Sequence, residues 1–252
     1  MANTAIGVGR SYLWDSGSLL IGRSLGESGV HAHHAIQIAL STAEISFRPA
    51  TGGWTSYRGV FITPNYPHAF ASYDNDVAHV FVEPESRPGR VILERIATTG
   101  IVMVPTADVD VAAAMLFEPW ARRPGAAVMI AAAQRVVQYF AGSVEPSQVP
   151  DERVARVIAH MKANIDRALT LTELADVANL SPGRFRHLFV GETGMTVRLY
   201  ILWLRFQRAW ELIAEGNSLS SAAHGAGFSD AAHLSRTSRR MFGVSPVAIQ
   251  ME

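Results

Sequence analysis

The chain has 252 residues, of which 48% are hydrophobic and 17% are charged. A chain of this length and composition can bury one large core or two ordinary ones, which excludes an intrinsically disordered protein. Basic and acidic residues each number 22, so the net charge indicates no particular partner. Because the chain has no cysteine, disulfides, thiolate metal ligands and a cysteine nucleophile are excluded.

The amino-terminal residues show no secretion signal, since no basic start is followed by an apolar core. No later segment approaches the roughly 18 uninterrupted apolar residues that a membrane span requires. We therefore expect a cytoplasmic protein that has no contact with a membrane.

The distribution of charge and the local composition divide the chain into two parts. Residues 1–150 contain 10 basic and 12 acidic side chains, whereas residues 151–252 contain 12 and 10. Two prolines, a glycine and two serines fall within residues 141–150, a composition typical of an exposed linker. We therefore expect a linker over residues 142–150.

Short apolar or alternating runs between turns predict several strands before residue 84. The expected strands cover residues 19–21, 35–40, 44–47, 59–63 and 77–82. Many short strands at this spacing indicate a sandwich or a barrel.

Helical periodicity replaces the strand pattern after Pro88, most clearly over residues 108–120 and 126–140. The alanine-rich segment 126–133 allows close helix packing. Its partner is either a helix of a second subunit or another part of the same chain.

Two helices joined by a tight turn are predicted near residue 171. Thr170 and Glu173 form a capping box, in which each side chain satisfies a free backbone amide at a helix start. After a left-handed turn at Asn179, Ser181 followed by Pro182 begins a second helix. The apolar positions of that helix face the core and leave a basic outer face, which is the geometry of a helix-turn-helix.

The same pattern returns after a connecting helix over residues 196–214. Ser218 is expected to cap a short helix over residues 219–224, Gly227 to supply the turn, and Ser229 to cap the next helix. The chain is therefore predicted to contain two helix-turn-helix units.

Residues 151–252 resemble the DNA-binding domain of the AraC/XylS family of transcription regulators. The resemblance is carried by residues 174–181, 188–194, 227–230 and 239–246, together with Tyr200 and Arg205. It implies two recognition helices, held by one long linking helix, that enter successive major-groove segments of double-stranded promoter DNA.

Carried over by position, the resemblance implies a set of DNA-contacting side chains: Arg184, Arg186, His187, His233, Ser235, Arg236 and Arg239. A solvated helix face is the alternative role for each arginine. Gly183, Ala231 and Ala232 stand where the family often has larger or polar side chains. Ser238 replaces an aromatic core residue, and a buried hydroxyl without a partner costs about 1–3 kcal/mol, so a looser second unit is expected.

Polar side chains also gather in the first half of the chain. On a strand over residues 31–37, alternation places His31, His33 and Gln37 on one face and His34 on the other. His68 follows a proline-rich turn at the end of another strand.

Together these patterns resemble the small β-barrel called the cupin fold, over roughly residues 18–84, which is also the usual sensing domain of the family. In metal-binding cupins a carboxylate follows the His-x-His pair; here Gln37 stands in its place.

Two roles for this group of side chains remain open. As metal ligands, His31, His33 and His68 with Gln37 suit a divalent zinc, nickel, copper or iron ion. Alternatively the histidines bond within the barrel or contact an organic effector beside Trp54. Four further side chains are candidates either for the wall of a pocket or for ordinary core packing: Tyr57, Phe61, Phe70 and His79.

The expected fold class is α+β, with four regions in chain order. These are a cupin-like β-barrel over residues 1–85, a helical segment over 86–141, a linker over 142–150, and a double helix-turn-helix domain over 151–252.

The favoured interpretation is a one-component transcription regulator that senses a small-molecule effector, with a second copy of the chain and RNA polymerase as further partners. The alternatives are a metal-sensing regulator and a metal-dependent cupin enzyme fused to a DNA-binding module. Phosphate-loop, serine-elbow and zinc-protease motifs are absent from the sequence, so no enzymatic activity is expected.

Overall fold

The computed structural model describes residues 6–251, which fold into two compact units. Within the described residues, the first unit contains 6–146 and 236–251, and the second contains 147–235. The expected α+β class is confirmed. The domain ranges drawn from the sequence stay a prediction, and they did not anticipate that residues 236–251 would return to the first unit.

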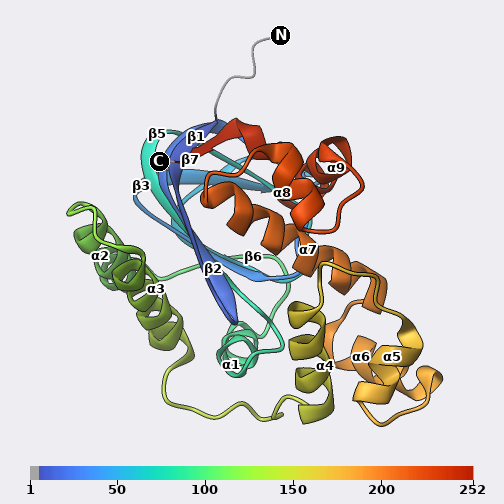
Figure 1. The fold of residues 1–252 in the computed structure, drawn as a ribbon. Helices are drawn as coiled ribbons and strands as arrows, with labels where there is room; N and C mark the ends of the chain where they lie inside the picture. Colours follow the sequence, from blue (N-terminus) through green and yellow to red (C-terminus); the bar gives the residue numbers. More distant parts are fainter. Residues whose placement is uncertain (1–5, 252) are drawn as a thin grey trace. The chain divides into compact units, whose positions relative to one another are not determined.

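A seven-stranded sheet forms the frame of the first unit (Figure 1). Its strands are β1 (Gly7–Trp14), β2 (Gly17–Glu27), β3 (Ile36–Pro49), β4 (Thr55–Ile62), β5 (His68–Val82), β6 (Ile101–Met103) and β7 (Ile249–Met251). They are ordered β6-β4-β3-β5-β2-β1-β7. All neighbours are antiparallel except β7, which pairs parallel to β1.

One long strand, β3, replaces the two strands expected over residues 35–40 and 44–47. Its pairing with β4 shifts register between Leu40 and Ile45, and its pairing with β5 shifts nearby. Ser41 holds this irregularity, because its hydroxyl donates to the carbonyl of Asp76 and accepts from the amide of Ala43. The residues between the two expected strands therefore form a bulge inside one strand.

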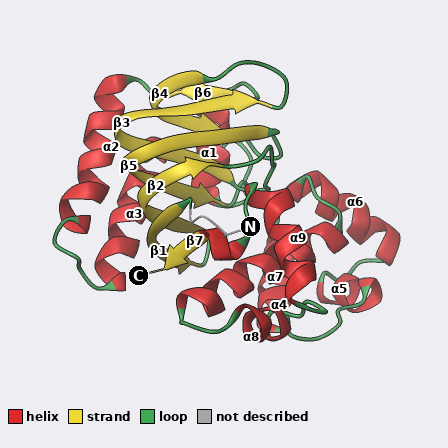
Figure 2. Ribbon diagram, turned by 90° about the horizontal axis from the view of Figure 1, so that it is seen from above, coloured by secondary structure: helices red, strands yellow, loops and turns green. Residues whose placement is uncertain are grey.

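Helices cover one face of the sheet and leave the other face for the site described below. These helices are α1 (Arg87–Ile96), α2 (Thr106–Trp120) and α3 (Ala126–Ala141), and Figure 2 shows α2 and α3 along the sheet. Strand alternation turns Ile38 and Val80 into the core beneath the helices. The neighbouring Gln37 and His79 consequently point to the opposite face.

The alanine-rich segment 126–133 packs against other elements of the same chain. Ala132 and Ala133 are fully buried in the same core cluster as residues of α2 and of the sheet. Small side chains let the helices approach closely at this point.

The second unit is helical: α4 (Glu152–Ala163), α5 (Leu171–Val177), α6 (Pro182–Thr193), α7 (Val197–Ala214) and α8 (Leu219–Gly225). The caps predicted at Thr170, Ser181 and Ser218 are confirmed, since each side chain accepts a bond from a backbone amide of the first helical turn. Within residues 6–251, no helix combines the length and the apolar character needed to cross a bilayer.

The last helix, α9 (Ala231–Phe242), begins in the second unit and ends in the first. Its predicted cap at Ser229 is wrong: the amide of His233 donates to the carboxylate of Asp230, 2.6 Å away. The hydroxyl of Ser229 instead donates to that same Asp230 side chain. Asp230 is the better cap because a carboxylate also interacts favourably with the positive end of the helix dipole. A short 3₁₀ turn (Pro246–Ala248) then leads to β7.

The capping interactions predict the stability of a Ser218→Ala variant. Removing the oxygen that accepts from the Ser221 amide leaves a free donor at the start of α8. We expect a loss of about 1 kcal/mol in the free energy of unfolding, measured by urea denaturation. Ser220→Ala, an exposed position in the same helix, is the matched control. Equal stability of the two variants would contradict the role of Ser218.

Candidate functional site

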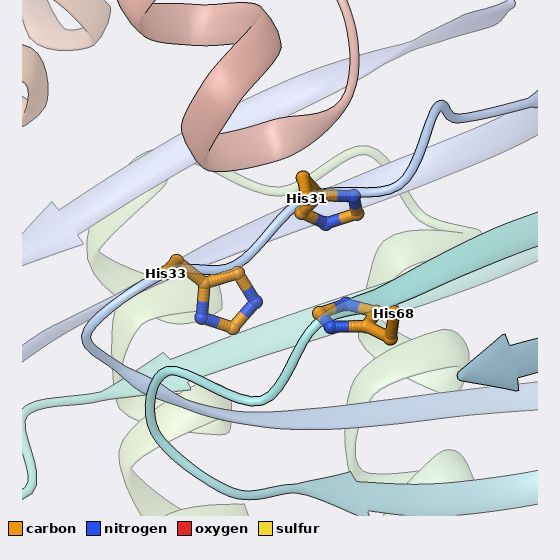
Figure 3. A group of neighbouring side chains, drawn as sticks. All are labelled: His31, His33 and His68. Carbon is orange, nitrogen blue, oxygen red and sulfur yellow. The ribbon is translucent and has the colours of Figure 1, made fainter. Parts of the chain in front are cut away.

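Three histidines from two segments meet on the face of the sheet opposite α1, α2 and α3 (Figure 3). His31 and His33 lie between β2 and β3, and His68 begins β5. The amides of His31 and His68 each donate to the other's carbonyl at 2.9 Å, while the Asn65 amide donates to the carbonyl of His33. The strand expected over residues 31–37 is therefore wrong before Ile36, because this backbone pairs with the segment around residues 65–68 instead.

The three rings have a fixed proton arrangement. Each Nδ1 lies 2.9 Å from a backbone carbonyl two residues away: His31 from Gly29, His33 from Ala35, and His68 from Tyr66. Because a carbonyl only accepts, each neutral ring carries its proton on Nδ1 and keeps a lone pair on Nε2. One ring nitrogen from each histidine lies within 4.8 Å of the other two.

Burial keeps these histidines neutral. It lowers the pKa of His31 to about 3, with a further contribution from His33, and lowers the pKa of His68 to about 2, with contributions from both neighbours. Burial likewise lowers the pKa of His33. The cluster therefore presents uncharged imidazoles at neutral pH.

Gln37 extends the histidine cluster, as the sequence predicted. Its Oε1 lies 2.8 Å from Nε2 of His33, and its Nε2 lies 2.8 Å from Nδ1 of His79. Burial lowers the pKa of His79 to about 4. His34 points elsewhere and bonds to Glu85 at 2.8 Å. Burial opposes protonation of His34, but Glu85 and Glu83 raise its pKa.

A pocket adjoins the cluster within the first unit. Its polar wall includes His31, Gln37 and His79, while most of its surface is apolar. The sheet contributes Leu20, Phe70, Val77 and Phe81, and the carboxyl-terminal segment contributes Phe242, Val244 and Ile249.

Two of the four further candidates, Phe70 and His79, line the pocket. Tyr57 and Phe61 pack against core clusters of the first unit. Trp54 is 43% exposed and stacks with Arg48, so the structure places it outside the pocket.

The carboxyl-terminal end of α9 contacts the histidine loop directly. The Gly29 amide donates to the carbonyl of Gly243 at 2.9 Å, and the Ala32 amide donates to that of Arg240 at 3.3 Å. The ring of Phe242 lies 5.6 Å from that of His33. Gly243 has a φ of 72°, and a Cβ there would lie 2.3 Å from the Gly29 oxygen, so only glycine fits.

Sequence reasoning missed the pocket walls that follow α9. Phe242 and Val244 belong to a motif that had been assigned to a helical domain, and no local pattern reports their contact with residues 29–37. Only the fold brings these distant segments together.

The basic faces lie where the helix periodicity predicted them. In α6, Arg184, Arg186 and His187 are exposed opposite the buried Phe185 and Phe189. In α9, Arg236 and Arg239 are exposed, whereas His233 and Ser235 are half-buried. The roles of these residues in DNA contact stay a prediction.

Ser238 is buried as expected, but its hydroxyl has a partner. It donates to the carbonyl of Val244 at 2.7 Å. The expected cost of an unsatisfied buried hydroxyl at this position is therefore avoided.

Comparison with known proteins matches a family model to the carboxyl-terminal part. A model described as a helix-turn-helix domain matches residues 174–251. The probable transcriptional regulator LumQ of Photobacterium leiognathi is 34% identical over 92 residues, 36% of this chain and 37% of that protein. The regulator GbdR of Pseudomonas aeruginosa is 30% identical over 115 residues, 45% of this chain and 30% of that protein. The chain thus covers about a third of the length of these relatives.

The fold of almost the whole chain is similar to a solved structure. ToxT from Vibrio cholerae O395 matches with a TM-score of 0.59 over 92% of this chain and 95% of that one. The sequence identity is 11%, so the likeness concerns the fold alone.

The buried histidines predict a loss of stability in mild acid. Below the ordinary histidine pKa of about 6.5, the unfolded chain binds protons that the folded chain excludes until about pH 4 at His79. We therefore expect the urea midpoint, measured with a chelator present, to fall between about pH 7 and pH 5. His79→Gln should reduce this dependence. His187→Gln, at an exposed position, should leave it unchanged, and a His79 variant that keeps the full dependence would refute the assignment.

Proposed function

We propose that residues 174–251, which match a helix-turn-helix domain model, form an AraC-type DNA-binding domain, and that the chain is a one-component transcription regulator controlled by a small molecule. The observation that carries the proposal is the composition of the pocket wall. Phe242, the last residue of α9, lines the same pocket as His31 and Gln37. A molecule in this pocket therefore touches a residue of a proposed recognition helix.

DNA contact is proposed for two helices, α6 and α9. Arginine guanidinium groups match the paired acceptors on a guanine edge, so Arg186 and Arg236 are the proposed base readers. Arg184, His187, His233, Ser235 and Arg239 are proposed to contact bases or phosphates around them.

The proposed effector is a small, mainly apolar molecule with at least one hydrogen-bonding group. The apolar wall favours burial of a hydrocarbon or aromatic body, while Gln37, His79 and Ser28 offer polar contacts. Other solved structures of ToxT hold an unsaturated fatty acid or a methylnaphthalenyl butenoic acid, which supports an apolar ligand for this fold.

Regulation would follow from a difference in effector affinity between two states of the first unit. An effector that packs against Phe242 and Val244 favours one placement of the segment that continues α9. If the two states also differ in their affinity for DNA, effector binding changes DNA affinity. DNA binding then changes effector affinity by the same factor, because linkage is reciprocal.

Assembly is a further part of the proposal. We place a homodimer contact on residues 86–141, where Val111 of α2 and Val128 of α3 are 43% and 50% exposed, and we include RNA polymerase as a partner at the promoter. No catalytic step is proposed for the chain.

Arginine variants test the DNA contact. With sites enriched from a random DNA pool by the full-length protein, Arg186→Ala and Arg236→Ala should weaken binding to an enriched site by about 5- to 150-fold. Loss on a scrambled duplex should be smaller, and fluorescence anisotropy measures both. Arg122→Ala, an exposed arginine outside the helical domain, is the control. Equal losses on both duplexes would reduce these arginines to phosphate contacts, and no binding by the wild type at low salt would refute the function.

Filling the pocket tests the sensing site. Leu20 faces the pocket, whereas its neighbours Leu19 and Ile21 are buried in the opposite core, so Leu20→Trp occupies the space without disturbing that core. With anilinonaphthalene sulfonate as the probe, we expect fluorescence enhancement by the wild type and at least a fivefold weaker response from Leu20→Trp. Leu25→Trp, at an exposed position on the same strand, should behave as the wild type. An unchanged response of Leu20→Trp would place the probe elsewhere.

A further inference from the structure

We propose that His31, His33 and His68 bind one divalent transition-metal ion of the zinc class, with the side-chain oxygen of Gln37 as a fourth ligand. Figure 3 shows the three rings around a common space. A metal site goes beyond the proposed regulator function, and it can be tested without DNA.

The free lone pairs of the three rings lie on the Nε2 atoms. Since the Nδ1 atoms of all three rings are committed to backbone carbonyls, the Nε2 atoms are the groups left to act as ligands. Nε2 of His68 is buried and has no hydrogen-bond partner within the described part of the chain. A buried acceptor without a partner costs free energy, and a metal ion would supply the missing interaction.

Each proposed histidine ligand is held in place by a hydrogen bond at its other ring nitrogen. A metal-bound imidazole almost always donates its other N–H to a carbonyl or carboxylate, which fixes the ring and strengthens the ligand. All three histidines have this arrangement. The reciprocal backbone pair of His31 and His68, and the bond from Asn65 to His33, hold the same segments in place.

Gln37 contacts the same histidine cluster through His33. Nε2 of His33 and Oε1 of Gln37 are both acceptors, and they face each other at 2.8 Å. A cation bound by both atoms would resolve this opposition. The competing arrangement is a 180° rotation of the amide, in which Gln37 donates to His33 and accepts from His79.

The dimensions of the cluster suit zinc once the ligand nitrogens of the histidines move closer together and Gln37 moves slightly away from His33. Zinc–nitrogen bonds of about 2.0–2.1 Å in a tetrahedron place neighbouring ligand atoms about 3.4 Å apart. The histidine nitrogens already lie within 4.8 Å of one another. Rotation of the rings about their side-chain bonds can close that difference while the backbone pairs stay intact. Neutral imidazole nitrogens and an amide oxygen also suit zinc better than a hard ion such as magnesium.

Metal content and zinc titration of the full-length, untagged protein test the site. After chelator treatment, we expect the wild type to bind one equivalent of Zn²⁺, measured by calorimetry and by elemental analysis after gel filtration. His33→Ala and His68→Gln should each weaken zinc binding at least 100-fold. His224→Ala, which removes an exposed histidine of α8, is the matched control and should bind zinc as the wild type does.

Retention of tight stoichiometric zinc by the His33 and His68 variants would overturn the site, as would the absence of zinc binding by the wild type. If these variants fail to fold by circular dichroism, X-ray absorption of the zinc-loaded wild type decides. Three imidazole ligands at about 2.0 Å support the proposal, and fewer refute it. Because zinc binding is measured without DNA, a negative result leaves the regulator function untouched, and loss of DNA binding leaves the metal site untouched.

Discussion

The reciprocal pair of backbone hydrogen bonds between His31 and His68 is the constraint on which the site depends. It joins the loop before β3 to the start of β5, so two segments without a regular ladder between them take fixed positions. The side chains then follow from elementary rules. Carbonyls two residues away orient the rings, burial keeps them neutral, and the unused nitrogens converge. The polar face of the sheet is therefore specified mainly by the backbone, with the side chains oriented by it.

The same loop also contacts the end of α9, and Gly243 makes this contact possible. Its left-handed backbone and missing Cβ let the carbonyl oxygen of Gly29 approach, while the carbonyl of Gly243 accepts the amide of Gly29. Phe242 then packs against the rings of His33 and Phe81. The proposed sensing face and the last turn of a proposed recognition helix are thus built from one set of contacts.

How far the sequence predicts this structure depends on the range of each interaction. Thr170, Ser181 and Ser218 bond to amides within three residues, so a local pattern was enough to place their helices. The cap of α9 was missed by one residue because Ser229 and Asp230 are both good caps. The side chains of His33 and Gln37 were placed together correctly although the strand beneath His33 was wrong, since a bond over four residues needs no regular ladder. Trp54 was misjudged as a pocket residue, and the contacts of Phe242 were not predicted, because the neighbours of both lie beyond any local sequence pattern.

The pairing of β7 with β1 has a consequence for how the protein matures. Residues 249–251 lie beside residues 7–9, so this edge of the sheet joins segments separated by most of the described chain. Contacts of such long range form late, since a large loop must close before they contribute. During synthesis the first strands leave the ribosome long before the residues that border their pocket. A nascent chain therefore lacks part of this pocket wall until α9 has also emerged, so that the proposed effector site and the proposed recognition helix are completed together.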